Sequence, residues 1–341
     1  MKNKKLLICG SYGAKNIGDE LILLGIKSLF EGNEITVLSE SKENNHFSKF
    51  PAGITSFIKF LKNRDNLKAL KDCDYFLLGG GNLFGGPSKR ANYIWAIQAL
   101  FAIFYKKPII VFCQSVGDNH DFITKKIIKY IFNKAYKIYL RDQESKFQLE
   151  KIGVKKEIKV LSDPAFVLNA KNITPQRKQQ IIIALREFKN FPEKITEELN
   201  KFIKKEGKPS ILINFETGVE NDGKQHEKLE GKIINFEDNP KDVIDEFTNA
   251  ELAICMRLHA VIVAIITKTP FIAISYAKKV KAMLQYADLE DLCLNIDELS
   301  LENLEKKKKY IEENKELIIG KMQKFKEMSE KILVKEIEDI E

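Results

Sequence analysis

The chain has 341 residues, of which 44% are apolar and 30% are charged. This composition builds ordinary hydrophobic cores, excludes an intrinsically disordered chain, and suits two domains at this length. The formal net charge of +8, from 56 basic and 48 acidic residues, favours anionic substrates or an anionic membrane surface. The sequence has no arginine-rich or aromatic-interleaved basic stretch, so we expect no nucleic-acid partner.

The cysteines and apolar runs bear on the compartment. None of the five cysteines forms a C-x-x-C pair, and most lie in apolar runs, which predicts core residues in a reducing compartment rather than disulfides or a zinc site. The apolar run Leu6 to Cys9 is too short for a signal peptide, and the longest apolar segments are shorter than the roughly 20 residues of a spanning helix. We expect a cytoplasmic protein, with peripheral membrane contact left open.

The first half of the chain alternates short apolar runs with helical patterns. The expected strands cover residues 5–10, 34–39, 74–78, 108–113, 137–140 and 158–161. The expected helices cover residues 21–30, 54–70, 91–105, 121–135 and 143–152. This alternation is typical of a doubly wound parallel sheet, so residues 1–168 are predicted to form an N-terminal Rossmann-like domain.

The pattern restarts after a polar linker, residues 169–178. The expected strands cover residues 180–185, 210–215, 232–236, 252–256 and 271–274, and the helices residues 192–205, 242–249, 258–267 and 279–286. Residues 179–299 are therefore a second Rossmann-like domain. In the helical segment 300–341, an apolar stripe is expected to pack on the body of the protein: Ile318, Met322, Phe325 and Ile332. We predict an α/β chain whose two doubly wound domains face a cleft, as in GT-B glycosyltransferases.

Basic and polar side chains follow the last two predicted strands: Arg257, His259, Ser275, Tyr276 and Lys279. Ligands of open α/β sheets bind at the carboxyl ends of strands, often against helix N-termini. Arginine, histidine and lysine at such an edge suit a small, highly charged anion. The alternative, that the arginine and the histidine are surface or capping residues, stays open.

Two glycine-containing loops of the first half also follow strands. The loop 11–18 contains Asn16, and Asp19 opens the helix after it. The loop matches neither G-x-G-x-x-G nor the P-loop, so no dinucleotide or nucleoside triphosphate is expected. Asp19 is either functional or a plain helix N-cap. The run Gly79, Gly80, Gly81 and Asn82 either brings backbone N–H groups close to an anion or sugar, or makes a sharp turn with positive φ.

Five segments, in this order, resemble the polysaccharide pyruvyltransferase family. They are GSYGAKNIGDE (10–20), LLGGGNL (77–83), YLRDQESKFQLEKIGV (139–154), DPAF (163–166) and MRLHAVIVA…PFIAISYAKKV (256–280). The family usually reads Ser-Tyr-Asp-Pro-Lys where this chain has Ser275-Tyr276-Ala277-Lys278-Lys279. The terminal lysine is kept and the acidic residue is missing.

The resemblance implies transfer of a pyruvyl group from phosphoenolpyruvate to hydroxyls of a cell-surface polysaccharide or its lipid-linked precursor, giving a pyruvate ketal. Arg257 and Arg141 are expected to bind the donor, with Lys279 beside them and Arg186 behind. His259 is expected to protonate C3 of the enol and Asp19 to act as base. The acceptor side is assigned to Asn16 and the glycine loop. No cofactor and no metal is expected, because no ligand cluster has metal-binding spacing.

Two other functions stay open at this point. The architecture also fits a GT-B glycosyltransferase that uses a nucleotide sugar, since fold alone does not fix function. The altered SYAKK segment also fits a non-catalytic family member that binds polysaccharide.

Overall fold

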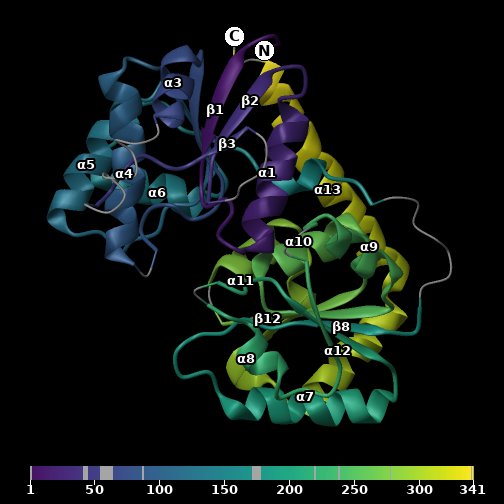
Figure 1. The fold of residues 1–341 in the computed structure, drawn as a ribbon. Coiled ribbons are helices and arrows are strands. Elements are labelled where there is room, and N and C mark those ends of the chain that lie inside the picture. Colours follow the sequence, from purple (N-terminus) through teal and green to yellow (C-terminus); the bar gives the residue numbers. More distant parts are fainter. Residues whose placement is uncertain are drawn as a thin grey trace. The chain divides into compact units, whose positions relative to one another are not determined.

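The computed structural model describes residues 2–40, 45–53, 64–86, 88–170, 178–218, 220–236, 239–276, 278–338 and 340 (Figure 1). The chain forms two α/β units, each built on an all-parallel sheet. Contacts group Met1–Ala14, Ile22–Val167 and Ser329–Glu341 in the first unit. They group Lys15–Leu21 and Leu168–Met328 in the second.

The first sheet has seven parallel strands in the order β3-β2-β1-β4-β5-β6-β7. The strands are β1 (Lys5–Cys9), β2 (Glu34–Leu38), β3 (His46–Phe47), β4 (Tyr75–Gly79), β5 (Ile109–Gln114), β6 (Lys137–Leu140) and β7 (Lys159–Val160). The helices are α1 (Ile17–Leu29), α3 (Asp65–Asp72), α4 (Lys89–Phe104), α5 (Phe122–Lys134) and α6 (Gln143–Ile152). Helices α4, α5 and α6 lie side by side on this unit (Figure 1).

The second sheet has six parallel strands in the order β10-β9-β8-β11-β12-β13. The strands are β8 (Ile181–Ala184), β9 (Ser210–Asn214), β10 (Lys232–Asn235), β11 (Leu252–Cys255), β12 (Phe271–Ser275) and β13 (Cys293–Asn295). The helices are α7 (Glu193–Glu206), α8 (Gly223–His226), α9 (Asp242–Asn249), α10 (Leu258–Ile266), α11 (Lys278–Tyr286), α12 (Leu301–Glu313) and α13 (Lys315–Glu338).

The central strands are apolar along their whole length because helices cover both faces of a doubly wound sheet. Every residue of β5, β8, β11 and β12 is buried. Helix α10 is also buried along most of its length, which explains its almost uninterrupted apolar sequence. The chain winding reverses between β1 and β4 in the first sheet and between β8 and β11 in the second. Ligand sites of such sheets form where the winding reverses.

The predicted fold class of two doubly wound parallel-sheet units is confirmed, and all eleven predicted strands are present. The prediction missed β3 and β13, because strands of two and three residues carry no readable periodicity. Most of the predicted linker 169–178, and residues 54–63 of the predicted helix 54–70, lie outside the described residues. The cleft between the units stays a prediction.

Two segments group differently from the domain bounds that the sequence suggested. Residues 15–21 were expected in the first domain, but their contacts group them with the second unit because Ile17 N donates to Phe215 O at 2.8 Å. The apolar stripe of α13 continues through Leu333, not through the half-buried Ile332. No helix in the described part of the chain combines the length and hydropathy that crossing a bilayer requires.

Candidate functional site

Two arginines flank the point where the second sheet reverses its winding. Arg186 follows β8, and Arg257 follows β11, which is its neighbour in the sheet. Arg257 is the N-cap residue of α10, with extended backbone angles of φ −77 and ψ 135. The sheet therefore places two guanidinium groups at its carboxyl edge, where ligands of this fold class bind.

The Arg257 guanidinium is surrounded by carboxylates. Its side chain is only 10% exposed, and its Nη2 and Nε donate to the two oxygens of Asp222 at 2.6 and 3.1 Å. Its Nη1 lies 3.1 Å from an oxygen of Glu216 and 3.5 Å from one of Glu220. A forked ion pair with a buried carboxylate fixes the plane of the guanidinium, so Arg257 is held rigidly.

Sequence reasoning missed the segment that supplies these carboxylates. Glu216, Glu220, Asp222 and His226 follow β9, which pairs with β8. Asp222 also accepts from the backbone N–H groups of Glu187 and Glu216, at 3.1 and 3.0 Å. The available signal was the run FETGVENDGKQH (215–226), which puts several titratable residues just after a predicted strand.

Arg186 joins the same cluster through Glu220. Its Nε and Nη2 donate to the Glu220 carboxylate, both at 2.9 Å, and its Nη1 donates to the Tyr276 hydroxyl. The guanidinium also lies over the Tyr276 ring, 5.2 Å from its centroid, and that ring stacks on Phe188. Burial raises the pKa of Tyr276, so the phenol stays protonated. Glu220 therefore links the two arginines.

The end of the β1–α1 loop reaches this cluster. Asn16 Nδ2 donates to Glu216 Oε2 at 3.1 Å, and the two residues form an isolated antiparallel bridge. A Cβ added to Gly18 would lie 2.1 Å from Nδ1 of His259, so the first turn of α1 packs directly on the imidazole. Two motifs more than two hundred residues apart in sequence thus meet within the second unit.

Asp19 lies in the first turn of α1, half-buried. Asn16 Oδ1 accepts from the Asp19 N–H at 3.3 Å, so Asn16 caps the helix and the interpretation of Asp19 as its N-cap is wrong. An acidic side chain is stabilised in a first turn by the helix dipole. Asp19 is therefore close in sequence to Asn16, which contacts Glu216, and directly follows Gly18, which packs on His259.

His226 is a buried, uncharged member of the cluster. Leu185 N donates to its Nε2 at 3.0 Å, so the ring proton is on Nδ1, which donates to Asn214 Oδ1. Burial, and next the charge of Arg257, lower its pKa to about 3. Burial raises the pKa of Glu216, against the opposing effect of Arg257, so its carboxyl binds a proton more readily than an exposed glutamate. Glu216 is therefore a candidate proton-transfer group and His226 is not.

The glycine loop belongs to the first unit. Gly80 and Gly81 have φ of +78 and +72, so the interpretation as a turn that needs positive φ is correct for this segment. A Cβ on Gly80 would lie 2.6 Å from Ile22 Cγ2 and 2.7 Å from the Tyr12 hydroxyl. Tyr12 in turn donates to Gly79 O at 2.8 Å, and Asn82, at the end of the loop, is exposed.

Arg141 also belongs to the first unit, at the end of β6. Its Nη1 donates to Asp163 at 2.6 Å, and its Nε and Nη2 donate to Ser115 Oγ at 3.0 and 2.8 Å. Ser115 Oγ donates to Asp142 at 2.6 Å, which continues the network. The Arg141 side chain is 9% exposed, so its guanidinium is largely committed to this network.

The remaining predicted residues lie at the end of β12. Ser275 closes this strand and is 8% exposed, whereas Lys279 is exposed in the first turn of α11. Ala277, where the sequence departs from the family pattern, lies outside the described residues. Among the residues with described positions, no group of three or more His, Cys, Asp or Glu side chains is arranged to hold a metal ion.

Comparisons with solved structures show the fold. A UDP-GlcNAc 2-epimerase from Neisseria meningitidis, bound to UDP-GlcNAc, has a TM-score of 0.62 at 12% identity, with 99% of each chain covered. A glycosyltransferase from Rickettsia africae has a TM-score of 0.60 at 14% identity, covering 100% of this chain and 98% of its own. These likenesses support a GT-B-like architecture of two α/β units, without showing a shared activity.

Sequence comparisons show the family. The amylovoran biosynthesis protein AmsJ of Erwinia amylovora is 23% identical over 267 residues, which cover 67% of this chain and 63% of that protein. The match thus spans less than two thirds of the relative's length. The family model described as polysaccharide pyruvyl transferase matches residues 16–278, a stretch that begins at the Asn16 contact and includes Arg257 and His259. With more than half of its length matched and the predicted resemblance confirmed, the chain belongs to the polysaccharide pyruvyl transferase family.

Proposed function

We propose that the protein transfers a pyruvyl group from phosphoenolpyruvate to two hydroxyls of a polysaccharide or of its lipid-linked saccharide precursor. Family membership supports a transferase that acts on polysaccharide. The observation that carries the proposal is the contact between Gly18 and His259, which joins the Gly-Asp-Glu turn of α1 to the Arg-Leu-His turn of α10. This contact supports a site in which an imidazole, a carboxylate of the first turn of α1 and a fixed arginine act together.

The donor is proposed to bind at Arg257 and Arg186. Phosphoenolpyruvate carries a phosphate and a carboxylate, both of which suit forked guanidinium donors. Asp222 holds Nε and Nη2 of Arg257, whereas Nη1 faces Glu216 and Glu220 at 3.1 and 3.5 Å. We infer that the anionic donor takes the Nη1 side, and that Glu216, whose pKa burial raises, binds a proton when it does. Lys279 is kept as a further donor contact.

The chemistry needs two proton transfers and one leaving group. His259 gives a proton to C3, which makes C2 electrophilic, and a first acceptor hydroxyl adds there. Phosphate leaves with both electrons of its C–O bond, and the second hydroxyl adds to C2 to close the ketal. Of the two hydroxyl protons, one replaces the proton lost by His259 and the other leaves with phosphate. Asp19 accepts a hydroxyl proton on the way, because Glu216 already carries a proton when the donor is bound.

The residues of the first unit are proposed to position loops or bind the acceptor rather than to bind the donor. Arg141 is committed to Asp163 and Ser115, so we assign it a positioning role for the loops at the end of β5 and β6 rather than donor binding. The exposed Asn82 and the backbone of Gly81 remain the candidates for an acceptor contact in this unit. Asn16, Ser275 and Tyr276 remain candidates in the second unit.

The test separates donor binding from chemistry. Phosphoenolpyruvate at about 100 times Kd should stabilise the protein by roughly 2.7 kcal/mol, visible as a rise in Tm. His259→Ala should keep that rise, and its release of phosphate with saccharide acceptors should fall by about 10²–10⁴-fold. Gly18→Ala should act in the same direction because its Cβ displaces the imidazole. Gly320→Ala, where an added Cβ meets nothing within 4 Å, is the matched control.

Three other results would overturn or change the proposal. A Tm that rises with UDP-N-acetylglucosamine and not with phosphoenolpyruvate would replace the proposal with a nucleotide-sugar glycosyltransferase. Full phosphate release by a folded His259→Ala protein would remove the imidazole from the mechanism. Donor binding without phosphate release from any vicinal or 1,3-diol saccharide would favour a non-catalytic binding protein.

A further inference from the structure

Helix α5 of the first unit presents an outer face made of lysines and large apolar side chains. Its exposed residues, which we call the α5 surface, are Phe122, Ile123, Lys125, Lys126, Lys129, Tyr130 and Lys134. Phe122 is 71% exposed and Ile123 60%, while the helix contains four lysines and no carboxylate. Lys126 Nζ lies 4.3 Å from the centroid of the Phe122 ring, one helical turn away. Cations and rings therefore alternate on one face.

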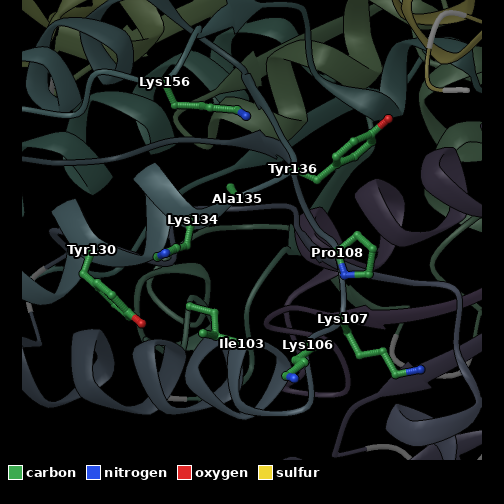
Figure 2. Close-up of a pocket in the computed structure, with 9 residues that line it drawn as sticks. All are labelled: Ile103, Lys106, Lys107, Pro108, Tyr130, Lys134, Ala135, Tyr136 and Lys156. Carbon is green, nitrogen blue, oxygen red and sulfur yellow. The ribbon is translucent and has the colours of Figure 1, made fainter.

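A basic hollow continues this surface at the carboxyl end of α5. Its volume is about 510 Å³, and Figure 2 shows the side chains that line it: Ile103, Lys106, Lys107, Pro108, Tyr130, Lys134, Ala135, Tyr136 and Lys156. Lys107 donates to the carbonyls of Lys71 and Cys73. Lys106, Lys134 and Lys156 have exposed side chains. The hollow can therefore offer several ammonium groups to one anion.

The hollow lies away from the candidate sites of its own unit. Pro108 directly precedes β5 and Tyr136 directly precedes β6, so the hollow is at the amino edge of the first sheet. The glycine loop and Arg141 follow β4 and β6, at the carboxyl edge of the same parallel sheet. The hollow is thus separate from those residues, and α5 runs from the carboxyl edge of the sheet at Phe122 to the hollow at the amino edge.

Exposed apolar side chains concentrate here. Among the described residues, ten large hydrophobic side chains are exposed, and six of them fall between residues 104 and 147: Phe104, Phe122, Ile123, Tyr130, Tyr136 and Phe147. Single exposed hydrophobics are ordinary, whereas a group of them marks an interaction site. Asp121, which directly precedes α5, caps this helix by accepting from Thr124 N at 2.8 Å.

We propose that the α5 surface and its basic hollow dock on an anionic lipid bilayer. A helix that combines lysines with Phe, Ile and Tyr suits the headgroup region, where rings enter the acyl boundary and ammonium groups meet lipid phosphates. The hollow takes a lipid phosphate between Lys106 and Lys134. Charge complementarity selects the occupant, because clustered lysines without carboxylates are attracted to an anionic leaflet.

The lysine run of α12 supplies an internal contrast. Lys306 and Lys309 lie 2.6 and 3.7 Å from Glu302 and Glu313 of the same helix. Their charges are therefore balanced along the helix, and α12 contributes none of the exposed large hydrophobics among the described residues. Lys306→Glu/Lys309→Glu changes net charge by the same amount as Lys125→Glu/Lys126→Glu without touching the α5 surface.

The experiment is cosedimentation of the full-length protein with vesicles. Vesicles of phosphatidylglycerol mixed with phosphatidylcholine should bind the wild type, and pure phosphatidylcholine should not. Lys125→Glu/Lys126→Glu should weaken binding by at least on the order of tenfold, and Phe122→Ser/Ile123→Ser should also weaken it. The α12 variant should bind nearly as wild type. All changed side chains are exposed, so every variant should stay folded, with only a small fall in Tm where a helical ion pair is lost.

Four outcomes would overturn the proposal. Equal binding to both vesicle types would exclude anionic lipid as the ligand. Equal loss of vesicle binding in the α5 and α12 variants would show that only the net charge of the protein matters. Displacement of the protein from vesicles by millimolar inorganic phosphate at constant ionic strength would identify a free-anion site. In that case a higher fraction of anionic lipid would not restore vesicle binding to the Phe122→Ser/Ile123→Ser protein. A concentration-dependent dimer lost in the same variants would instead assign the surface to a second copy of the chain.

Discussion

Arg141 in the first unit and Arg257 in the second each follow a parallel strand, and their surroundings differ. Arg141 and Arg257 have side chains that are 9% and 10% exposed, and each forms an ion pair of 2.6 Å with a buried aspartate. Arg141 shares its remaining donors with a serine hydroxyl, whereas Arg257 faces two glutamates as well. A cation that already faces several anions can exchange one of them for a substrate, and this supports the proposal that the donor binds in the second unit.

The largest effect is expected from the buried aspartates. Asp222→Asn removes the forked carboxylate partner of Arg257, and Asp163→Asn removes the nearest carboxylate of Arg141. Each change leaves a buried guanidinium poorly paired, which should lower the free energy of unfolding by about 3–5 kcal/mol. Chemical denaturation combined with hydrogen exchange, which reports each unit separately, measures both.

The matched control for Asp222 is Glu216→Gln. It removes one of three carboxylates around Arg257, and burial already disfavours the charge of Glu216, so its cost should be about 1 kcal/mol or less. An Asp222→Asn protein as stable as Glu216→Gln would show that the forked pair does not anchor Arg257.

The glycine loop should give the next largest effect. Gly80→Ala places a Cβ 2.6 Å from Ile22 Cγ2 at a φ of +78, and strain together with overpacking should cost about 2–4 kcal/mol. Gly86→Ala, in the same loop, is the control because its Cβ would have ordinary contacts of 3.5 Å or more. The measurement is the Tm of both variants. Equal Tm values for Gly80→Ala and Gly86→Ala would contradict the tight packing of Gly80.

A pH effect of about 2 kcal/mol is expected from His226. Its pKa is lowered from 6.5 to about 3, so the unfolded chain binds a proton that the folded protein rejects. Its contribution is complete above about pH 6.5 and is lost progressively as the pH falls toward 3. Near pH 5 the loss should be about 2 kcal/mol, from 1.36 kcal/mol per pKa unit.

His226→Gln is the control for this pH effect, because a glutamine oxygen can still accept from Leu185 N. On acidification from pH 7.5 to 5, the wild type should lose more unfolding free energy than the variant, by the amount that His226 contributes. An unchanged difference would mean that His226 charges in the folded protein.

The smallest effect is expected from Tyr276→Phe. The ring remains between Phe188 and Arg186, and only the hydroxyl that accepts from Arg186 Nη1 is lost. The expected cost is about 1 kcal/mol in stability. The Tm shift by phosphoenolpyruvate should be retained, and its complete loss would assign the hydroxyl to donor binding.

The sequence predicted the strands because buried parallel strands are uninterrupted apolar runs, and it predicted Arg257 and His259 because they directly follow such a run. It could not predict Asp222 as the partner of Arg257, because pairing across the sheet depends on the order of β8, β9 and β11, which local patterns do not contain. The same limit applies to residues 15–21, whose contacts group with the second unit. Their contact with Phe215 and Glu216 joins segments about 200 residues apart.

The packing of Gly18 on His259 has a consequence for genetics. Every missense change of a glycine codon adds at least a Cβ, and at this position that atom would lie 2.1 Å from the imidazole. A screen for loss of the proposed transferase activity should therefore recover many different alleles at codon 18, spread over all the amino acids that one base change can reach. The exposed Lys15, three codons away, should contribute few. A map of spontaneous mutations would thus mark this contact without any purified protein.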